Sequence, residues 1–96
     1  MLFAIRCLDR PGKLSVRQET RPAHVAYLQG QGEKLFAAGP LLDDNEQMCG
    51  SLVIIKAASR AEAEAFAASD PYARAGLFSQ VTIDCWNKVL PATPKA

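Results

Sequence analysis

The sequence is short of the residues on which most recognisable sites depend. Its 96 residues include one histidine, three cysteines and one tryptophan. A single histidine and three widely spaced cysteines without a C-x-x-C pair make a poor zinc or redox site. A glycine-rich phosphate loop, a G-x-S-x-G elbow and a histidine pair at metal-binding spacing are also missing. We therefore expect neither a metal nor a cofactor.

The sequence also lacks an excess of charge and any long apolar run. The formal net charge is +1, which gives no electrostatic footprint for nucleic acid. No basic run exceeds two residues, so an anionic membrane surface is not an expected partner. No apolar stretch approaches the roughly 20 residues that span a bilayer, and residues 1–9 lack the features of a signal peptide. We expect a cytoplasmic protein in which the cysteines are small buried thiols.

What is present is the composition of an ordinary globular domain. Hydrophobic residues make up 49% of the chain and charged residues 22%, and the length suits one domain with a single core. We assign residues 1–90 to this domain. Residues 91–96 are expected to form a fraying, proline-containing tail.

Four segments have the pattern of β-strands. Residues 2–9 alternate, with Phe3, Ile5 and Cys7 on one side. Residues 34–42 contain Gly39-Pro40, which predicts an edge strand or a bend because proline cannot donate to a ladder. A polar connector over 43–50 leads to the most apolar run, 51–57, the expected central strand. Residues 77–89 form the last strand.

Two segments have the pattern of helices. The first begins at Ser15, and Thr20 with Pro22 indicates either a helix start or a second start, since proline is tolerated in a first turn. Glycines in residues 30–34 are expected to end it in the left-handed conformation. Ser59 and Glu62 form a capping box for the second helix, which stops at Asp70-Pro71. Residues 70–76 read as a turn or a single helical turn.

The order of these elements is βαββαβ. Two βαβ halves in about 90 residues predict a ferredoxin-like α+β fold, an antiparallel sheet with both helices on one face. The first and last strands carry apolar side chains on both faces, exemplified by Leu8 and Trp86 on the uncovered side. Because a large apolar face is rarely left in water, we expect two chains to pack sheet to sheet as an obligate homodimer or larger assembly.

The single histidine, His24, is the main candidate for chemistry. Imidazole titrates near neutrality and suits general acid-base work, but it needs a partner that fixes its tautomer. Asp70 is one candidate, because helices packed side by side would bring it within reach, and Asp43 or Asp44 in the connector are others. The alternative is that His24 is a satisfied surface residue and Asp70 simply ends a helix.

Five short motifs resemble those of the YciI family of small proteins, the YCII-related domain. They are RPAH at 21–24, AAGP at 37–40, GS at 50–51, SDPYARAGLF at 69–78 and WNKVL at 86–90. The resemblance covers nearly the whole chain and implies a dimeric α/β barrel, in which two ferredoxin-like sheets pack face to face. It also implies an active site built on His24 and Asp70, with Gly50 and Ser51 lining the same pocket. One relative in this family is a dehydrochlorinase acting on a chlorinated hydroxyhydroquinone, and similar barrels include muconolactone isomerases.

Three hypotheses follow. In the first, the protein is a cofactor-free lyase or isomerase. Asp70 orients His24, whose other ring nitrogen moves a proton, while Arg21, Ser51 and Tyr72 bind a small, aromatic-derived substrate. The reaction is an elimination, a dehydrochlorination or an isomerisation. In the second, the same cleft binds a metabolite without converting it, as an accessory module. In the third, His24 and Asp70 only join two helices.

Overall fold

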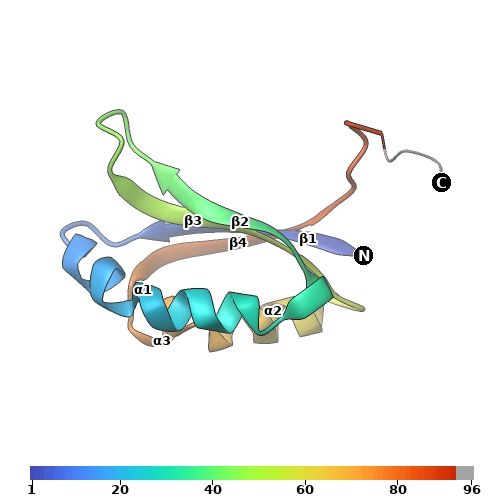
Figure 1. The fold of residues 1–96 in the computed structure, drawn as a ribbon, viewed down its shortest axis with the longest axis horizontal. Coiled ribbons are helices and arrows are strands. Elements are labelled where there is room, and N and C mark those ends of the chain that lie inside the picture. Colours follow the sequence, from blue (N-terminus) through green and yellow to red (C-terminus); the bar gives the residue numbers. More distant parts are fainter. Residues whose placement is uncertain (93–96) are drawn as a thin grey trace.

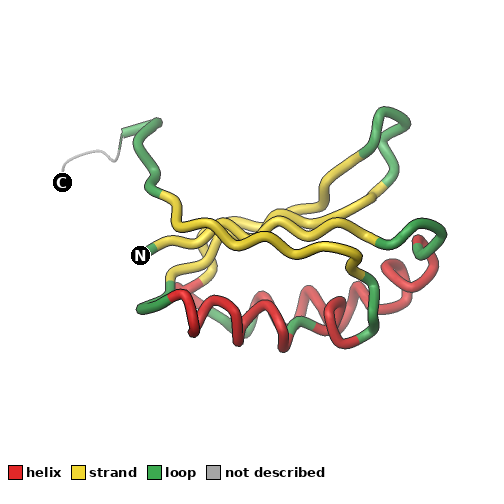
Figure 2. Tube along the Cα trace, turned by 180° about the vertical axis from the view of Figure 1, so that it is seen from behind, coloured by secondary structure: helices red, strands yellow, loops and turns green. Residues whose placement is uncertain are grey.

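The computed structural model describes residues 1–92, within which four strands form one antiparallel sheet in the order β2-β3-β1-β4. The elements along the chain are β1 (Leu2–Asp9), α1 (Leu14–Gln29), a 3₁₀ turn (Gly32–Lys34), β2 (Leu35–Leu42), β3 (Met48–Lys56), α2 (Arg60–Ser69), α3 (Pro71–Arg74) and β4 (Phe78–Trp86). Figures 1 and 2 show α1 and α2 together under one face of this sheet. The predicted ferredoxin-like fold is thus confirmed, with α3 as an added helical turn.

The core lies between the sheet and the helices. The side chains of strand β1 alternate between the two faces of the sheet, as the sequence predicts. Those on the core side, Phe3, Ile5 and Cys7, are all at most 4% exposed. They pair in register with Ile55, Val53 and Ser51 of β3, which confirms β3 as a central strand. Burying each large apolar side chain contributes about 1.5–3 kcal/mol.

Helix α1 differs from the prediction in its relation to Pro22. The helix begins at Leu14 and runs through Pro22 to Gln29, so the second start proposed at Thr20 is wrong. Arg17 precedes Pro22 and Leu28 follows it, and both are buried. Because the two halves pack against the same structure, tertiary contacts offset the cost of about 3 kcal/mol that an interior proline brings. His24 therefore lies in the second half of a continuous helix.

The other corrections concern where elements end. Gly30 closes α1 in the right-handed conformation, and it is Gly32 that has a positive φ, 60°. The connector between β2 and β3 is shorter than predicted, because Met48 already pairs with Leu42. Asp43 makes this tight turn possible by accepting the amides of Asn45 and Gln47. Strand β4 covers 78–86 rather than 77–89, and of the predicted tail only 91 and 92 lie within the described residues.

Candidate active site

His24 and Asp70 are in direct contact. His24 Nδ1 lies 2.8 Å from Asp70 Oδ1, and the two residues are 8% and 5% exposed. The ring nitrogen donates this bond, because a carboxylate can only accept. Asp70 lies at the junction of α2 and α3, and the same oxygen accepts the Tyr72 amide at 2.9 Å as the N-cap of α3. The carboxylate is thus fixed by the backbone and in turn fixes the imidazole, leaving Nε2 free.

The other two acidic candidates are not used in this way. Asp43 and Asp44 lie in the exposed β2–β3 turn, where the Asp43 carboxylate binds turn amides. Of the three carboxylates considered from the sequence, only Asp70 contacts the histidine.

Tyr72 stacks on the histidine ring. The ring centroids of His24 and Tyr72 are 3.9 Å apart with an interplanar angle of 20°. The guanidinium carbon of Arg17 lies 4.5 Å from the Tyr72 centroid, within the range of a cation-π contact. Arg17 and His24 are seven residues apart on one face of α1, which is about 10.5 Å along the axis. The Tyr72 ring, 1% exposed, therefore fills the space between them.

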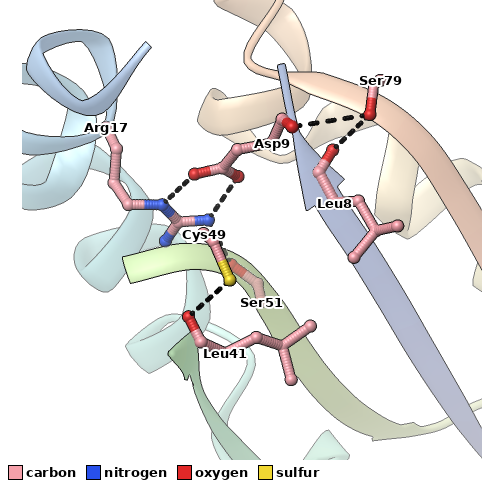
Figure 3. A network of polar contacts seen from close by, with 7 residues as sticks. All are labelled: Leu8, Asp9, Arg17, Leu41, Cys49, Ser51 and Ser79. Atoms are coloured by element: carbon pink, nitrogen blue, oxygen red, sulfur yellow. Dashed lines mark hydrogen bonds and ion pairs between the residues drawn. The ribbon is translucent and has the colours of Figure 1, made fainter. Parts of the chain in front are cut away.

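Arg17 is the centre of a second polar network, drawn in Figure 3. Its Nε and Nη2 donate to the two oxygens of Asp9 at 2.7 and 2.8 Å, and Nη2 also donates to Ser51 Oγ at 2.9 Å. Burial opposes the charge of Arg17, but the bonds and charge of Asp9 outweigh it, so the pKa of Arg17 is raised above its usual value. The Ser79 hydroxyl donates to the Leu8 carbonyl and so fixes the end of the strand that carries Asp9.

Ser51 reaches this network because the residue before it is glycine. A Cβ at Gly50 would lie 2.4 Å from the Cys7 carbonyl oxygen and 3.0 Å from Leu41 Cδ1. Only glycine allows β3 to pass so close to its neighbours. The adjacent Ser51 then faces the helices, opposite Cys7 in the register.

The two networks meet at a cavity of about 270 Å³ between α1, β2, β3 and α3. Its polar lining is formed by Arg17, Arg21, His24, Gln29, Ser51 and Tyr72. Leu28, Pro40 and Met48 are among its apolar walls. Asp70 lies behind His24 and is not part of the lining. Burial raises the pKa of Tyr72, so its phenol stays protonated near neutral pH.

Another hollow of about 280 Å³ lies towards the C-terminal end of α1. Its charged groups include Lys34 and Glu62, an exposed pair 3.7 Å apart. Buried and oriented polar groups, which a site for chemistry requires, are found in the first cavity.

The residue pattern together with the family resemblance predicted a site of Arg21, His24, Ser51, Asp70 and Tyr72. In the structure Asp70 lies behind His24 and the other four line this cavity. The pattern did not point to Asp9 or Arg17. A signal was present, because positions 17, 21, 24 and 28 share one face of a helix. Three polar residues on the face that ends in buried Leu28 indicate that this face lines a polar site.

The described part of the chain has neither a metal-binding cluster nor a membrane-spanning helix. Within residues 1–92, no group of three or more histidine, cysteine, aspartate or glutamate side chains could hold a metal ion. None of the helices there is long and apolar enough to cross a membrane.

Comparison with solved structures confirms the fold and gives one close relation. The chain is 39% identical to 5-chloro-2-hydroxyhydroquinone dehydrochlorinase (TftG) from Burkholderia phenoliruptrix AC1100, solved in complex with 2,5-dihydroxybenzoquinone, with a TM-score of 0.83 over 91% of this chain and 94% of that one. It also resembles SnoaB, a cofactor-independent oxygenase from Streptomyces nogalater, with a TM-score of 0.57 over 95% and 96% of the two chains. At 10% identity, that second likeness concerns the fold alone.

Sequence comparison identifies the family. Protein YciI of Escherichia coli O6:H1 is 37% identical over 98 residues, which cover 93% of this chain and 99% of that protein. The family model of the YCII-related domain matches residues 1–87. The chain therefore belongs to the YCII-related domain family.

Proposed function

We propose that the protein is a small enzyme, independent of a cofactor, that performs acid-base chemistry with His24 and Asp70. The reaction class is elimination, dehydrochlorination or isomerisation of a small, aromatic-derived metabolite. The observation that carries the proposal is the fixed imidazole. Asp70 binds Nδ1 at 2.8 Å and Tyr72 covers one ring face, so Nε2 is the nitrogen available to a ligand in the cavity.

These reactions require neither an oxidant nor a reductant. In an elimination of HCl, Nε2 takes a proton from the substrate, the electron pair left by that proton forms a new π bond, and chloride leaves with the electron pair of its former bond to carbon. In an isomerisation, the same proton returns to a different carbon. Asp70 keeps the ring in one tautomer and one orientation, the role that a carboxylate plays beside a catalytic histidine. Arg21 and Ser51 are suited to bind a substrate oxygen. Tyr72, whose ring is packed between His24 and Arg17, borders the cavity and holds these two side chains in place.

The relation to TftG supports this reaction class. That protein is a dehydrochlorinase, and its complex contains a planar quinone. The cavity, at about 270 Å³, is just below the range of about 300–1,000 Å³ usual for ligand pockets, which suits a single ring.

We also propose that the working form is a homodimer in the cytoplasm. Phe36, Leu52 and Trp86 are 46%, 38% and 38% exposed, although they are large and apolar. The Phe36 and Trp86 rings contact each other at 6.0 Å, and the strand register places Trp86 on the face opposite the helices, next to Leu2. A second copy covering this face would remove the apolar patch from water. The cysteines at 7, 49 and 85 are free, which is consistent with a reducing compartment. Only Cys7 is buried as expected, because Cys49 is half-buried and Cys85 is exposed.

Turnover can be tested with 5-chloro-2-hydroxyhydroquinone as the first substrate and release of chloride as the readout. Replacing His24 with Asn should lower the rate at least about 100-fold, the usual size of a general acid-base contribution. Asp43→Asn, in the remote turn, is the matched control and should keep the full rate. A fully active His24→Asn protein would contradict the proposal.

The alternative is a module that binds the same ligand without converting it. The observation that favours it is that the lining groups named above can all bind a ligand without reacting with it. Saturable binding of 2,5-dihydroxybenzoquinone by the wild-type chain, with no conversion across a panel of halogenated hydroxyhydroquinones, would support this alternative. If His24→Asn changes only stability and leaves ligand binding intact, the pair serves to join α1 to α3.

A further inference from the structure

The hydroxyl proton of Ser51 has no acceptor among the residues that the structure describes. The residue is 2% exposed, and its Oγ accepts a bond from Arg17 Nη2 at 2.9 Å. A guanidinium can only donate, so the proton of the Ser51 hydroxyl cannot be used in that contact. No hydrogen bond among residues 1–92 has this hydroxyl as the donor. Because Ser51 lines the cavity, a buried donor is left for whatever enters it.

The carboxylates near the cavity already bind donors of the protein. Both oxygens of Asp9 accept bonds from Arg17, and Asp70 Oδ1 accepts from His24 and from the Tyr72 amide. Neither aspartate is in the cavity lining. The ligand therefore meets no carboxylate, and the amide of Gln29, which is exposed, is the neutral acceptor at the rim.

The cavity also carries one uncompensated positive charge. Arg17 is neutralised by its paired bonds to Asp9, and His24 faces Asp70. Arg21 lies one turn beyond Arg17 on α1 and lines the cavity, and no ion pair among residues 1–92 involves it. Arg21 is an exposed residue and Ser51 a buried one, so the cavity has a cationic group at its open side and a hydroxyl donor inside. These are the groups that recognise an anionic oxygen.

We propose that this pocket takes a ring compound with an anionic oxygen (a carboxylate, phenolate or enolate), which Arg21 and Ser51 bind. Arg17 is a positioning residue: its bond to Ser51 Oγ turns the hydroxyl proton towards the ligand. The inference rests on the proposed function only in taking this ligand to be the substrate.

The test compares three ring compounds that differ in one substituent: benzoate, benzyl alcohol and benzylamine. Binding to the wild-type chain is followed by ¹H-¹⁵N NMR titration. We expect benzoate to shift the resonances of the lining residues and to bind at least about tenfold more tightly than benzyl alcohol, since a bond to a charged group contributes about 1.5–3 kcal/mol. Benzylamine should not bind there.

Arg21→Gln should weaken benzoate binding about tenfold or more and bring it near that of benzyl alcohol. The matched control is Arg74→Gln, an exposed arginine of α3 outside the cavity lining, which should leave affinity unchanged. Equal affinity of benzoate and benzyl alcohol, an unaffected Arg21→Gln protein, or the absence of any benzoate shift at the lining would overturn the proposal.

The positioning role of Arg17 is tested by a double-mutant cycle. Arg17→Lys keeps the charge but cannot bind Asp9 and Ser51 together. Arg17→Lys should lower the affinity for benzoate about as much as Ser51→Ala does. The double variant should bind benzoate only slightly more weakly than either single variant. If the two substitutions reduce the free energy of benzoate binding additively, Arg17 does not act through Ser51. Because benzoate has nothing to eliminate, these results stand whether or not the chain releases chloride, so the ligand class and the proposed reaction can fail separately.

Discussion

At the scale of single residues, the site depends on charges that lie out of water. Arg17 is 2% exposed and its partner Asp9 is almost as well buried, with a side chain 8% exposed. Removing one member of such a pair leaves the other charge uncompensated, whereas in the intact pair two charge-assisted hydrogen bonds offset the cost of burying the charges. The same pair orients Ser51, so the stability of the domain and the shape of the site share one interaction.

We expect Asp9→Asn to destabilise the protein by about 3–5 kcal/mol, the cost of breaking a buried pair. That is a large share of the 5–15 kcal/mol typical of a domain. Urea unfolding monitored by circular dichroism measures the change. Asp44→Asn, in the exposed turn, is the control and should fall within about 0.5 kcal/mol of the wild type. Equal midpoints for the two variants would show that the pair adds no net stability.

Cys7 gives a prediction about alkaline pH. Burial, followed by the nearby charge of Asp70, raises the pKa of this thiol to about 12. In the unfolded chain the thiol has the ordinary value of 9.0. The folded state thus favours the neutral form, and the stability that this provides is complete below pH 9 and lost as the pH rises towards 12.

Between pH 8 and pH 10, the wild type should therefore lose about 1 kcal/mol more unfolding free energy than Cys7→Ala does. Urea unfolding at the two pH values gives both differences. Cys85→Ala is the control, because Cys85 is exposed, and it should keep the wild-type pH dependence. If the unfolding free energy of Cys7→Ala depends on pH as that of the wild type does, the pKa of Cys7 is not raised by folding.

At the scale of elements, the sequence predicts the features that depend on interactions between residues close together in the chain. Alternation in residues 2–9 fixes which side chains of β1 enter the core. The N-cap bond of the capping box forms as expected, since the Glu62 amide donates to Ser59 Oγ, and the Glu62 carboxylate reaches back to the amide of Ala58, one residue before the cap. These features depend on neighbours within four residues, so the sequence reveals them.

The features that the sequence did not reveal depend on distant partners. Arg17 turns inward because Asp9 and Ser51, 8 and 34 positions away, bind it. α1 continues through Pro22 because both of its halves pack on the core. The proximity of His24 to Asp70 was predicted from the helix arrangement and is observed, although the contact is made at the junction of α2 and α3 by a residue in the second half of α1. Their catalytic role stays a prediction.

Asp70 has two tasks that variants can separate, because it caps α3 and binds His24. Asp70→Asn keeps an oxygen that can accept the Tyr72 amide, whereas Asp70→Ala removes the cap. We expect Asp70→Ala to be less stable than Asp70→Asn by about 0.5–2 kcal/mol, while both lose turnover. Urea unfolding and chloride release measure the two effects. If the two variants are equally stable, the cap contributes nothing.

At the scale of the whole molecule, the helices cover one face of the sheet and leave the other without a helix (Figures 1 and 2). The site lies on the covered side, between α1, α3 and the sheet. The apolar residues Phe36, Leu52 and Trp86 are therefore not needed for the cavity. Their exposure calls for another explanation, and the one with the fewest assumptions is a second copy of the same face.

A charge placed on this face should separate the copies while leaving each fold intact. We expect the wild type to have the mass of a dimer by light scattering after gel filtration at micromolar concentration, and Leu52→Lys that of a monomer, because a buried unpaired ammonium costs several kcal/mol. Ala68→Lys, at an exposed position of α2, adds the same charge on the helix side and should remain dimeric. Circular dichroism verifies that both variants fold. A monomeric wild type, or a dimeric Leu52→Lys protein, would mean that the open face is not the contact between copies, and the apolar residues on it would then have to be explained by a different partner.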